Sequence, residues 1–234
     1  MRVLAFDTAL GACSAAVLIV EDGRRSLARA YEVRARGHAE ALMPMIGSVM
    51  TEAGLSFGEL DRFAVTTGPG TFTGCRIGVA AARGLALVAG HPIVAATTLA
   101  VMDRTARAMR SDLAGDVLTV AVDARRGQVY AAAYGPDGAA IADVALLAVA
   151  DAAARVPEGA VAVGSAAPLL AEAARLRGRR IRAELTDLEP DAGALAEMAL
   201  TRAPETGSVR PLYLRPPDAK PQATPAVALA PDRR

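Results

Sequence analysis

The sequence predicts an α/β protein of two lobes that share one topology. Segments typical of strands alternate with segments typical of helices along 234 residues, a length that can bury one large core or two small ones. Two stretches also resemble each other: VLAFDTALGACSAAVLIVEDG at 3–23 and LTVAVDARRGQVYAAAYGPDG at 118–138. In each, a strand ends at an aspartate, a glycine follows four residues later, and an Asp-Gly turn follows the second strand. The order of these matches favours a duplicated lobe that begins with a hairpin.

The first lobe is expected to open with three strands and a helix. Apolar runs predict the strands, and Asp22-Gly23 between the second and the third predicts a hairpin turn. A helix is predicted over 39–53, where apolar residues recur every three or four positions and Gly54 provides a stop. Pro44 lies inside this pattern and predicts a kink. The three strands are expected at 3–6, 15–20 and 28–33.

A strand at 63–67 leads into the glycine-rich stretch GPGTFTGCRIG at 68–78, which opens a second helix. Glycine-rich turns before helices often bind phosphate. A Walker-type loop needs a lysine after its last glycine, whereas cysteine and arginine stand there in this chain, and the GxGxxG spacing is also absent. We therefore interpret the stretch as a tight turn in which Thr71 or Thr73 caps the helix.

Small residues form a stripe along the second helix. Gly74, Gly78 and Ala82 are four residues apart, with Arg83 at the edge of the stripe, and this spacing permits another helix to approach closely. Two interpretations remain open. The stripe packs against the 39–53 helix inside the lobe, or the helices dock on another protein. The pattern alone favours internal packing.

The second half of the chain repeats the first. The stretch AVAVGSAAPLL at 160–170 echoes the strand, glycine turn and helix of 63–87, and a helix at 97–110 is expected to connect the lobes. A short strand and then an extended tail are expected at 211–222. The predicted organisation is a first lobe at 1–98, a second lobe at 99–210 and an extended C-terminal segment at 211–234.

Bulk composition points to no nucleic-acid or membrane partner. The 26 basic and 25 acidic residues leave a net charge of +1. The uncharged stretch at 84–102 is long enough to suggest a membrane span, but Gly90-His91-Pro92 interrupts it. Asp7 interrupts the apolar N-terminus, unlike a signal peptide. We expect a soluble, cytoplasmic protein whose Cys13 and Cys75 are buried free thiols.

Five stretches in order between residues 5 and 222 resemble one family: FDTA, RGHAEALMPMI, GPGTFTGCRIG, DARRGQVYAA and PLYLRPPDAKPQ. Together they are similar to the bacterial TsaB family, also called YeaZ. The GPG-T/S-FTG-x-RIG element is highly specific, and the other stretches support it. The chain departs from the family pattern at two places: Ala9 stands where serine is usual, and Cys75 where leucine is common.

The resemblance implies the two-lobed actin-like ATPase fold, which is also ribonuclease-H-like. It implies a subunit of the machinery that makes N6-threonylcarbamoyladenosine at position 37 of tRNA. Such a subunit pairs with the TsaD-type catalytic subunit and recruits the TsaE-type ATPase, but does not carry out the transfer itself. It meets tRNA only through the complex, and ATP and magnesium enter at the level of the complex.

The resemblance also implies a partner-binding surface on two helices of the first lobe, which match residues 38–53 and 74–88. No catalytic residue is expected, and no metal site. The catalytic relative uses an HxxxH motif, whereas the two histidines of this chain, His38 and His91, are far apart. The implied partner-binding residues are His38, Leu42, Met43, Ile46, Met50, Gly74, Arg76, Gly78, Ala82 and Arg83.

Asp7 and Asp123 leave a second function open. They match positions where actin-like ATPases place carboxylates near magnesium and phosphate, which would suit an ATP-dependent small-molecule kinase. The simpler interpretation is that both aspartates cap the turns that follow their strands, and we prefer it. A third hypothesis is a homodimer that uses the same apolar helices on a second copy.

Overall fold

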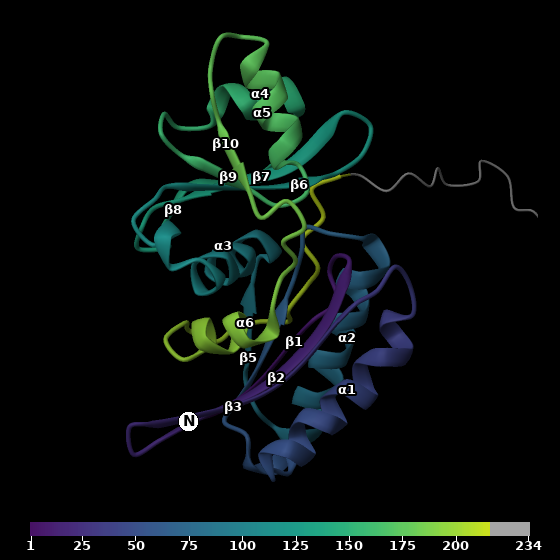
Figure 1. The fold of residues 1–234 in the computed structure, drawn as a ribbon. Helices are drawn as coiled ribbons and strands as arrows, with labels where there is room; N and C mark the ends of the chain where they lie inside the picture. The colour runs from purple at the N-terminus through teal and green to yellow at the C-terminus, as the bar shows by residue number, and fades with distance from the viewer. Residues whose placement is uncertain (216–234) are drawn as a thin grey trace, which may run out of the picture.

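The computed structural model describes residues 1–215, which form two five-stranded sheets, one above the other in Figure 1. The strand order is β3-β2-β1-β4-β5 in the first sheet and β10-β9-β6-β7-β8 in the second. The first sheet consists of β1 (Arg2–Asp7), β2 (Ala12–Glu21), β3 (Arg24–Val33), β4 (Arg62–Thr66) and β5 (Ile93–Ala96). The second consists of β6 (Leu118–Asp123), β7 (Gln128–Tyr134), β8 (Ala140–Ala148), β9 (Val161–Val163) and β10 (Arg182–Glu184).

Both sheets pair their strands in the same way. In the first, β1-β2 and β2-β3 are antiparallel, while β1-β4 and β4-β5 are parallel. In the second, β6-β7 and β7-β8 are antiparallel, while β6-β9 and β9-β10 are parallel. This duplication confirms the predicted repeat. The fold is the two-lobed actin-like, ribonuclease-H-like α/β fold.

The helices form layers on both sides of the sheets (Figure 1). α1 and α2 cover the outer face of the first sheet, α3 and α6 lie between the sheets, and α4 and α5 cover the second sheet. Two 3-10 turns, Phe57–Glu59 and Ser111–Leu113, complete the described elements. The helices are α1 (His38–Ala53), α2 (Phe72–Ala89), α3 (Thr98–Met109), α4 (Val149–Arg155), α5 (Ala167–Arg175) and α6 (Ala192–Ala199).

Local sequence signals behave as predicted in the first lobe. Asp22 and Gly23 adopt φ of 49° and 74° in the β2-β3 turn, and Gly54 ends α1 in the left-handed conformation. The helix α1 is continuous through Pro44, and the kink expected there stays a prediction. Of the two candidate caps of α2, Thr71 takes the role, because its Oγ1 accepts the Gly74 N–H at 3.0 Å. Both cysteines are buried and free, as expected.

The second lobe needs a correction at its end. It was expected over 99–210, but α6 packs on the first sheet, where its Leu195 is fully buried beside Val3 and Leu18. Val209 likewise joins the core under α1 and α2. The chain therefore returns to the first lobe after the second sheet is complete.

The short strand expected at 211–222 is not formed in its described part. Residues 211–215 have no strand assignment, although the Leu212 N–H donates to the Thr67 carbonyl at 2.7 Å. The remainder of that stretch, and the tail expected after it, lie outside the described residues.

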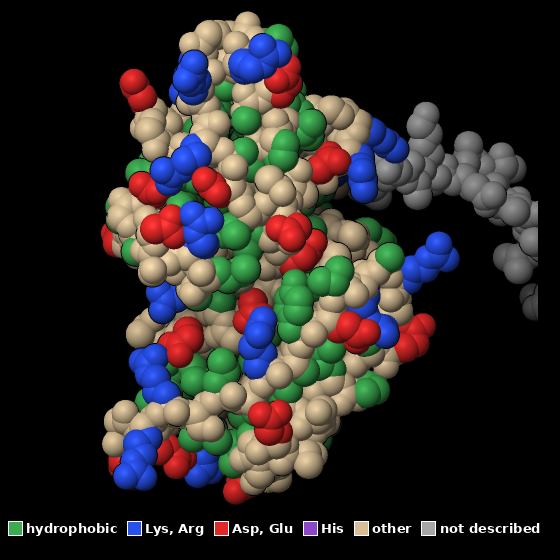
Figure 2. Space-filling view, in the orientation of Figure 1, with side chains coloured by type: hydrophobic (Ala, Val, Ile, Leu, Met, Phe, Trp, Pro, Cys, Tyr) green, Lys and Arg blue, Asp and Glu red, His purple; other side chains and the backbone are tan. Residues whose placement is uncertain are grey.

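The apolar stretch at 84–102 is divided as predicted into a helix end, a turn and the strand β5. Within residues 1–215, α2 is long and apolar enough to cross a membrane by length and composition alone. Its inner face, however, is buried against the first sheet. On the molecular face in Figure 2, basic and acidic side chains are interspersed.

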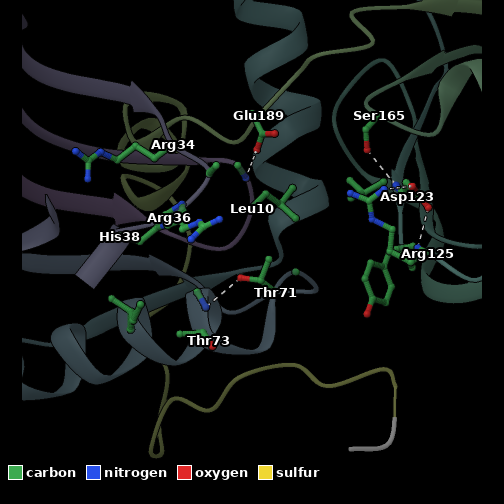
Figure 3. A pocket seen from close by; sticks show the side chains of 18 of the residues that line it. Leu10, Arg34, Arg36, His38, Thr71, Thr73, Asp123, Arg125, Ser165 and Glu189 are labelled. Atoms are coloured by element: carbon green, nitrogen blue, oxygen red, sulfur yellow. Dashed lines mark hydrogen bonds and ion pairs between the residues drawn. The ribbon is translucent and has the colours of Figure 1, made fainter. Parts of the chain in front are cut away.

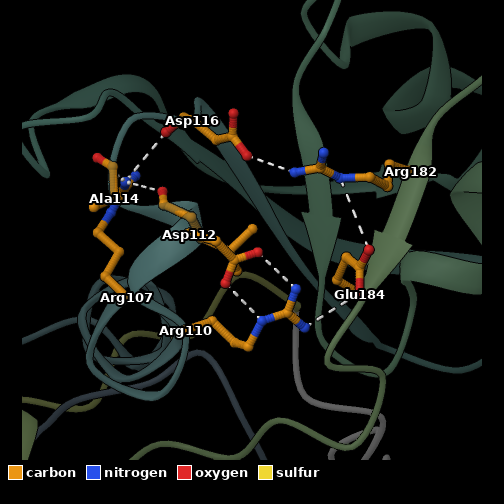
Figure 4. A network of polar contacts seen from close by, with 8 residues as sticks. Arg107, Arg110, Asp112, Ala114, Asp116, Arg182 and Glu184 are labelled. Atoms are coloured by element: carbon orange, nitrogen blue, oxygen red, sulfur yellow. Dashed lines mark hydrogen bonds and ion pairs between the residues drawn. The ribbon is translucent and has the colours of Figure 1, made fainter.

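A buried arginine on α3 ties the connecting helix to the second lobe. Arg107 pairs with Asp103 at 3.0 Å, and their side chains are 9% and 4% exposed. Its guanidinium also donates to the Asp116 carbonyl at 3.1 Å and the Gly135 carbonyl at 2.8 Å, and part of this network appears in Figure 4. Burial raises the pKa of Asp103, although the hydrogen bond from Arg107 opposes that shift.

Arg107→Ala is expected to lower the free energy of unfolding by about 3–5 kcal/mol, because it leaves the Asp103 carboxylate buried without its partner. Urea unfolding followed by circular dichroism measures the change. Arg110→Ala is the matched control, since its pairs with Asp112 and Glu184 lie at the surface, where water screens them, and a much smaller loss is expected. Equal losses in the two variants would contradict the stabilising role of the buried Arg107–Asp103 pair.

Candidate functional site

A cleft of about 920 Å³ separates the lobes at the carboxyl ends of β1 and β6. Figure 3 shows Arg34, Arg36 and His38 on one side of it and Asp123 and Arg125 on the other. The first-lobe side comes from the loop after β1, the segment before α1 and the first turn of α2. Ligands of open α/β sheets bind outside the carboxyl ends of the strands, so the topology favours this place.

Asp123 lies at the rim of the cleft, with its side chain 30% exposed. Its carboxylate accepts the backbone N–H of Arg125 at 2.7 Å and pairs with the Arg125 guanidinium at 3.3 Å. The Asp123 backbone N–H donates to Ser165 Oγ at 3.0 Å. These contacts stabilise the turn that follows β6.

Asp7 ends β1 in the equivalent position, but it is fully buried and is not among the residues that line the cleft. Thr66 Oγ1 donates a hydrogen bond to its carboxylate, and the Ala9 N–H lies 3.3 Å from both carboxylate oxygens. Burial raises the pKa of Asp7 to about 7, while these hydrogen bonds oppose that shift. The fold therefore does not bring Asp7 and Asp123 together at one open site.

The glycine-rich loop packs against Thr8 and Ala9, the two residues that follow Asp7. A side-chain carbon added at Gly70 would overlap the Ala9 carbonyl oxygen, and one added at Gly74 would overlap the Thr8 carbonyl oxygen. Thr8 Oγ1 in turn donates to the Gly74 carbonyl at 2.7 Å. Only glycine permits this backbone contact, so the loop works as a packing element against the end of β1.

The cleft itself carries more arginines than carboxylates. Glu189 accepts the Gly11 N–H at 2.9 Å, and burial raises the pKa of this carboxyl. His38 Nε2 is buried without a hydrogen-bond partner in the described chain. Among the described residues, no three His, Cys, Asp or Glu side chains are grouped so that they could hold a metal ion. The charged lining residues are Arg34, Arg36, Arg125 and Arg215 against Glu40, Asp123 and Glu189.

The small-residue stripe of α2 faces the sheet. A side-chain carbon at Gly78 would lie 2.9 Å from Thr8 Oγ1 and 3.4 Å from Val65 Cγ2. Gly74, Gly78 and Ala82 are all buried. The stripe is thus internal, but its neighbours at Gly78 are the loop after β1 and β4, where we had expected the helix at 39–53.

Six of the ten residues expected at the partner surface lie inside the first lobe. On α2 these are the stripe residues Gly74, Gly78 and Ala82. On α1 they are Leu42, Ile46 and Met50, which belong to the core between α1 and the first sheet. His38 is partly buried at the start of α1. Met43, Arg76 and Arg83 are exposed. These exposed side chains mark the outer faces of the two helices, which lie next to each other in Figure 1.

Several exposed residues of this surface were not singled out from the sequence. Leu87 and Val88 are 86% and 90% exposed at the end of α2, and Ala80 is exposed in its middle. Phe72 at the start of α2 stacks on Tyr213 with ring centroids 5.3 Å apart, and Arg76 lies over Phe72 at 4.7 Å. The spacing of residues 76, 80, 83 and 87 places them on one face of a helix, and this spacing could have identified the exposed face from the sequence.

Gly78→Ala is expected to lower the free energy of unfolding by about 1–3 kcal/mol, because the added methyl crowds Thr8 and Val65. Gly84→Ala on the same helix has no atom within 4 Å of the added carbon, and is expected to stabilise by roughly 0.5–1 kcal/mol. Thermal and urea unfolding of both variants measure the difference. Equal effects would contradict an internal stripe, and Gly78→Arg is expected to disrupt the lobe.

Asp7→Asn is expected to flatten the dependence of stability on pH. The folded chain keeps a proton on Asp7 up to a pKa of about 7, whereas the unfolded chain releases it near 3.8. The free energy of unfolding therefore falls as pH rises between these values, by at most about 1.4 kcal/mol per pH unit from this group. Urea unfolding from pH 4.5 to 8 measures how the free energy of unfolding changes with pH in each protein. Equal slopes in wild type and Asp7→Asn would refute a raised pKa for Asp7.

Comparison with known proteins places this architecture in a family. The sequence model of TsaD, the tRNA N6-adenosine threonylcarbamoyltransferase, matches residues 31–174. The chain is 41% identical over 137 residues to the tRNA threonylcarbamoyladenosine biosynthesis protein TsaB of Escherichia coli (strain K12), covering 58% of this chain and 56% of that protein. It is 33% identical over 130 residues to the protein of the same name in Haemophilus influenzae, covering 56% and 52%. The chain thus aligns with about half the length of these relatives.

A solved structure extends the likeness to the whole fold. It is the crystal structure of an uncharacterized Pseudomonas aeruginosa protein with similarity to peptidase YeaZ, with a TM-score of 0.76 and 29% sequence identity. The superposition covers 92% of this chain and 99% of that one. Sequence motifs, duplicated topology and these relatives agree, and the chain belongs to the TsaB (YeaZ) family.

Proposed function

We propose that this chain is a non-catalytic partner subunit in the synthesis of N6-threonylcarbamoyladenosine at position 37 of tRNA. In this role it pairs with a TsaD-type catalytic subunit and supports it. Its relatives in Escherichia coli and Haemophilus influenzae are named for this biosynthesis. The observation that carries the proposal is the outer face of α2, where Leu87 and Val88 are almost fully exposed.

The shape of α2 supports a docking role. Its inner face packs on the sheet through the small residues Gly74, Gly78 and Ala82. These residues let the helix lie close to β4. Its outer face presents Arg76, Ala80, Arg83 and Leu87 along one line. Apolar side chains left in water at the end of such a line favour association with another protein.

The surroundings of Asp7 support a role without catalysis by this chain alone. A kinase of this fold would need the carboxylate to reach a magnesium ion. Asp7 is instead fully buried, and its carboxylate accepts hydrogen bonds from Thr66 and from the Ala9 N–H. The alternative of an ATP-dependent small-molecule kinase has no comparable support.

Further parts of the proposal follow from family membership. The complex would recruit a TsaE-type ATPase, use ATP and magnesium at the level of the assembly, and contact tRNA through the assembly. The chain would work in the cytoplasm. In the absence of the catalytic subunit, α1 and α2 would pair two copies of the chain, so self-pairing and partner binding would compete for one surface.

Capture of the TsaD-type protein from the same cell tests the pairing. Ala80→Arg places a long charged side chain on the exposed line of α2 without touching the core, and is expected to weaken capture about tenfold or more. The measurement is co-purification followed by a binding titration with the purified partner.

Ala154→Arg is the matched control, because it adds the same side chain to an exposed helical alanine of the second lobe. It is expected to bind as wild type does. Equal capture by both variants would place the contact elsewhere, and no capture by wild type would refute the pairing.

A further inference from the structure

A second cavity, of about 580 Å³, shares no lining residue with the cleft near Asp123. It is formed by the start of β3, the middle of α3, the turn between β7 and β8, and the end of α6 with the residues that follow. Both lobes and the connecting helix therefore contribute to its wall.

The charged residues of this cavity are mostly arginines. Four guanidinium groups line it against two carboxylates. Because Arg107 is paired with the buried Asp103 carboxylate, the excess at the cavity is one positive charge. The charged residues are Arg25, Arg104, Arg107 and Arg202 against Asp137 and Glu197.

The two carboxylates are already engaged within the protein. Asp137 accepts the Ala139 N–H at 3.0 Å, and Glu197 pairs with Arg25 at 2.8 Å. Arg107 is the buried arginine of α3, and its N–H groups donate to Asp103 and to backbone carbonyls of the second lobe. Its charge is balanced by Asp103, so a ligand in the cavity relies on neither the charge nor the N–H groups of Arg107.

The remaining arginines are available to a ligand. Arg104 and Arg202 are exposed and make no hydrogen bond or ion pair to another side chain of the described chain. Arg25 uses one terminal nitrogen toward Glu197, and its side chain is 59% exposed. Two unengaged guanidinium groups with a third beside them form a typical setting for a phosphate group, which accepts several charge-assisted hydrogen bonds at once.

We propose that this cavity binds a phosphate group through Arg104 and Arg202, with Arg25 as the third donor. The two guanidinium groups that are unpaired in the described chain suit a phosphate, which carries one negative charge as a backbone diester and nearly two as a terminal group. The phosphate belongs either to a small free anion or to the backbone of an RNA, and both sources share this chemistry. The proposal involves none of the residues of the α1 and α2 surface, so it stands apart from the proposed pairing.

The test measures binding of inorganic pyrophosphate and, separately, of an unmodified tRNA transcript to the full chain by calorimetry at constant ionic strength. Arg104→Gln and Arg202→Gln are expected to weaken binding about tenfold each, because each removes charged hydrogen bonds. Both side chains are exposed, so the variants are expected to melt at the wild-type temperature. If the double variant fails to fold, the single variants give the answer.

Arg24→Gln is the matched control, since it removes the same charge from the neighbouring position on β3 and Arg24 does not line the cavity. Loss of pyrophosphate binding in the double variant, with Arg24→Gln as wild type, supports a site for a free anion. The same loss for tRNA alone supports a backbone phosphate. If wild type binds neither probe, or if the double variant binds both as tightly as Arg24→Gln does, the proposal is refuted.

Discussion

The first lobe depends on a direct backbone contact between the loop after β1 and the beginning of α2. Gly70 and Gly74 bring the glycine-rich segment against the carbonyl groups of Ala9 and Thr8, where no side chain would fit. This contact holds α2 on the sheet with its small residues inward. The contact lies directly after Asp7, whose buried carboxylate is hydrogen-bonded to Thr66 and to the Ala9 N–H. The same constraint turns the other face of α2 outward, where Arg76, Ala80, Arg83 and Leu87 are exposed.

The connecting helix α3 holds the two lobes together, because it packs on both sheets. α3 buries Val101 against the first sheet and Met102 against the core of the second. Arg107 on the same helix binds carbonyl groups of the second lobe, and α6 lies on the inner face of the first sheet. A shift of one sheet relative to the other would therefore disturb the packing of α3 on one or both sheets. Both cavities lie along the junction that these helices fix.

Much of the fold could be predicted from the sequence, because its signals are local. The hairpin turn at Asp22-Gly23, the stop at Gly54 and the repeat around Asp123 each depend on residues close together in the chain. The candidate site could be predicted less well, because side-chain direction depends on tertiary packing. Helical periodicity predicted that Gly78 lies on a face of α2 that another segment approaches closely. It did not indicate that this segment is the loop containing Thr8. Likewise, nothing local to Leu195 indicated that α6 packs on the first sheet.

The return of α6 to the first sheet affects how the chain is made. Synthesis runs from the N-terminus, and Val3, Ala5 and Leu18 are complete long before the ribosome reaches Ala192–Ala199. Until then the inner face of the first sheet lacks part of its apolar cover, and exposed apolar surface in a nascent chain promotes aggregation and chaperone binding. A gene fragment ending near residue 98 would leave the same face uncovered permanently. The first sheet thus completes its apolar cover only after α6 has been translated.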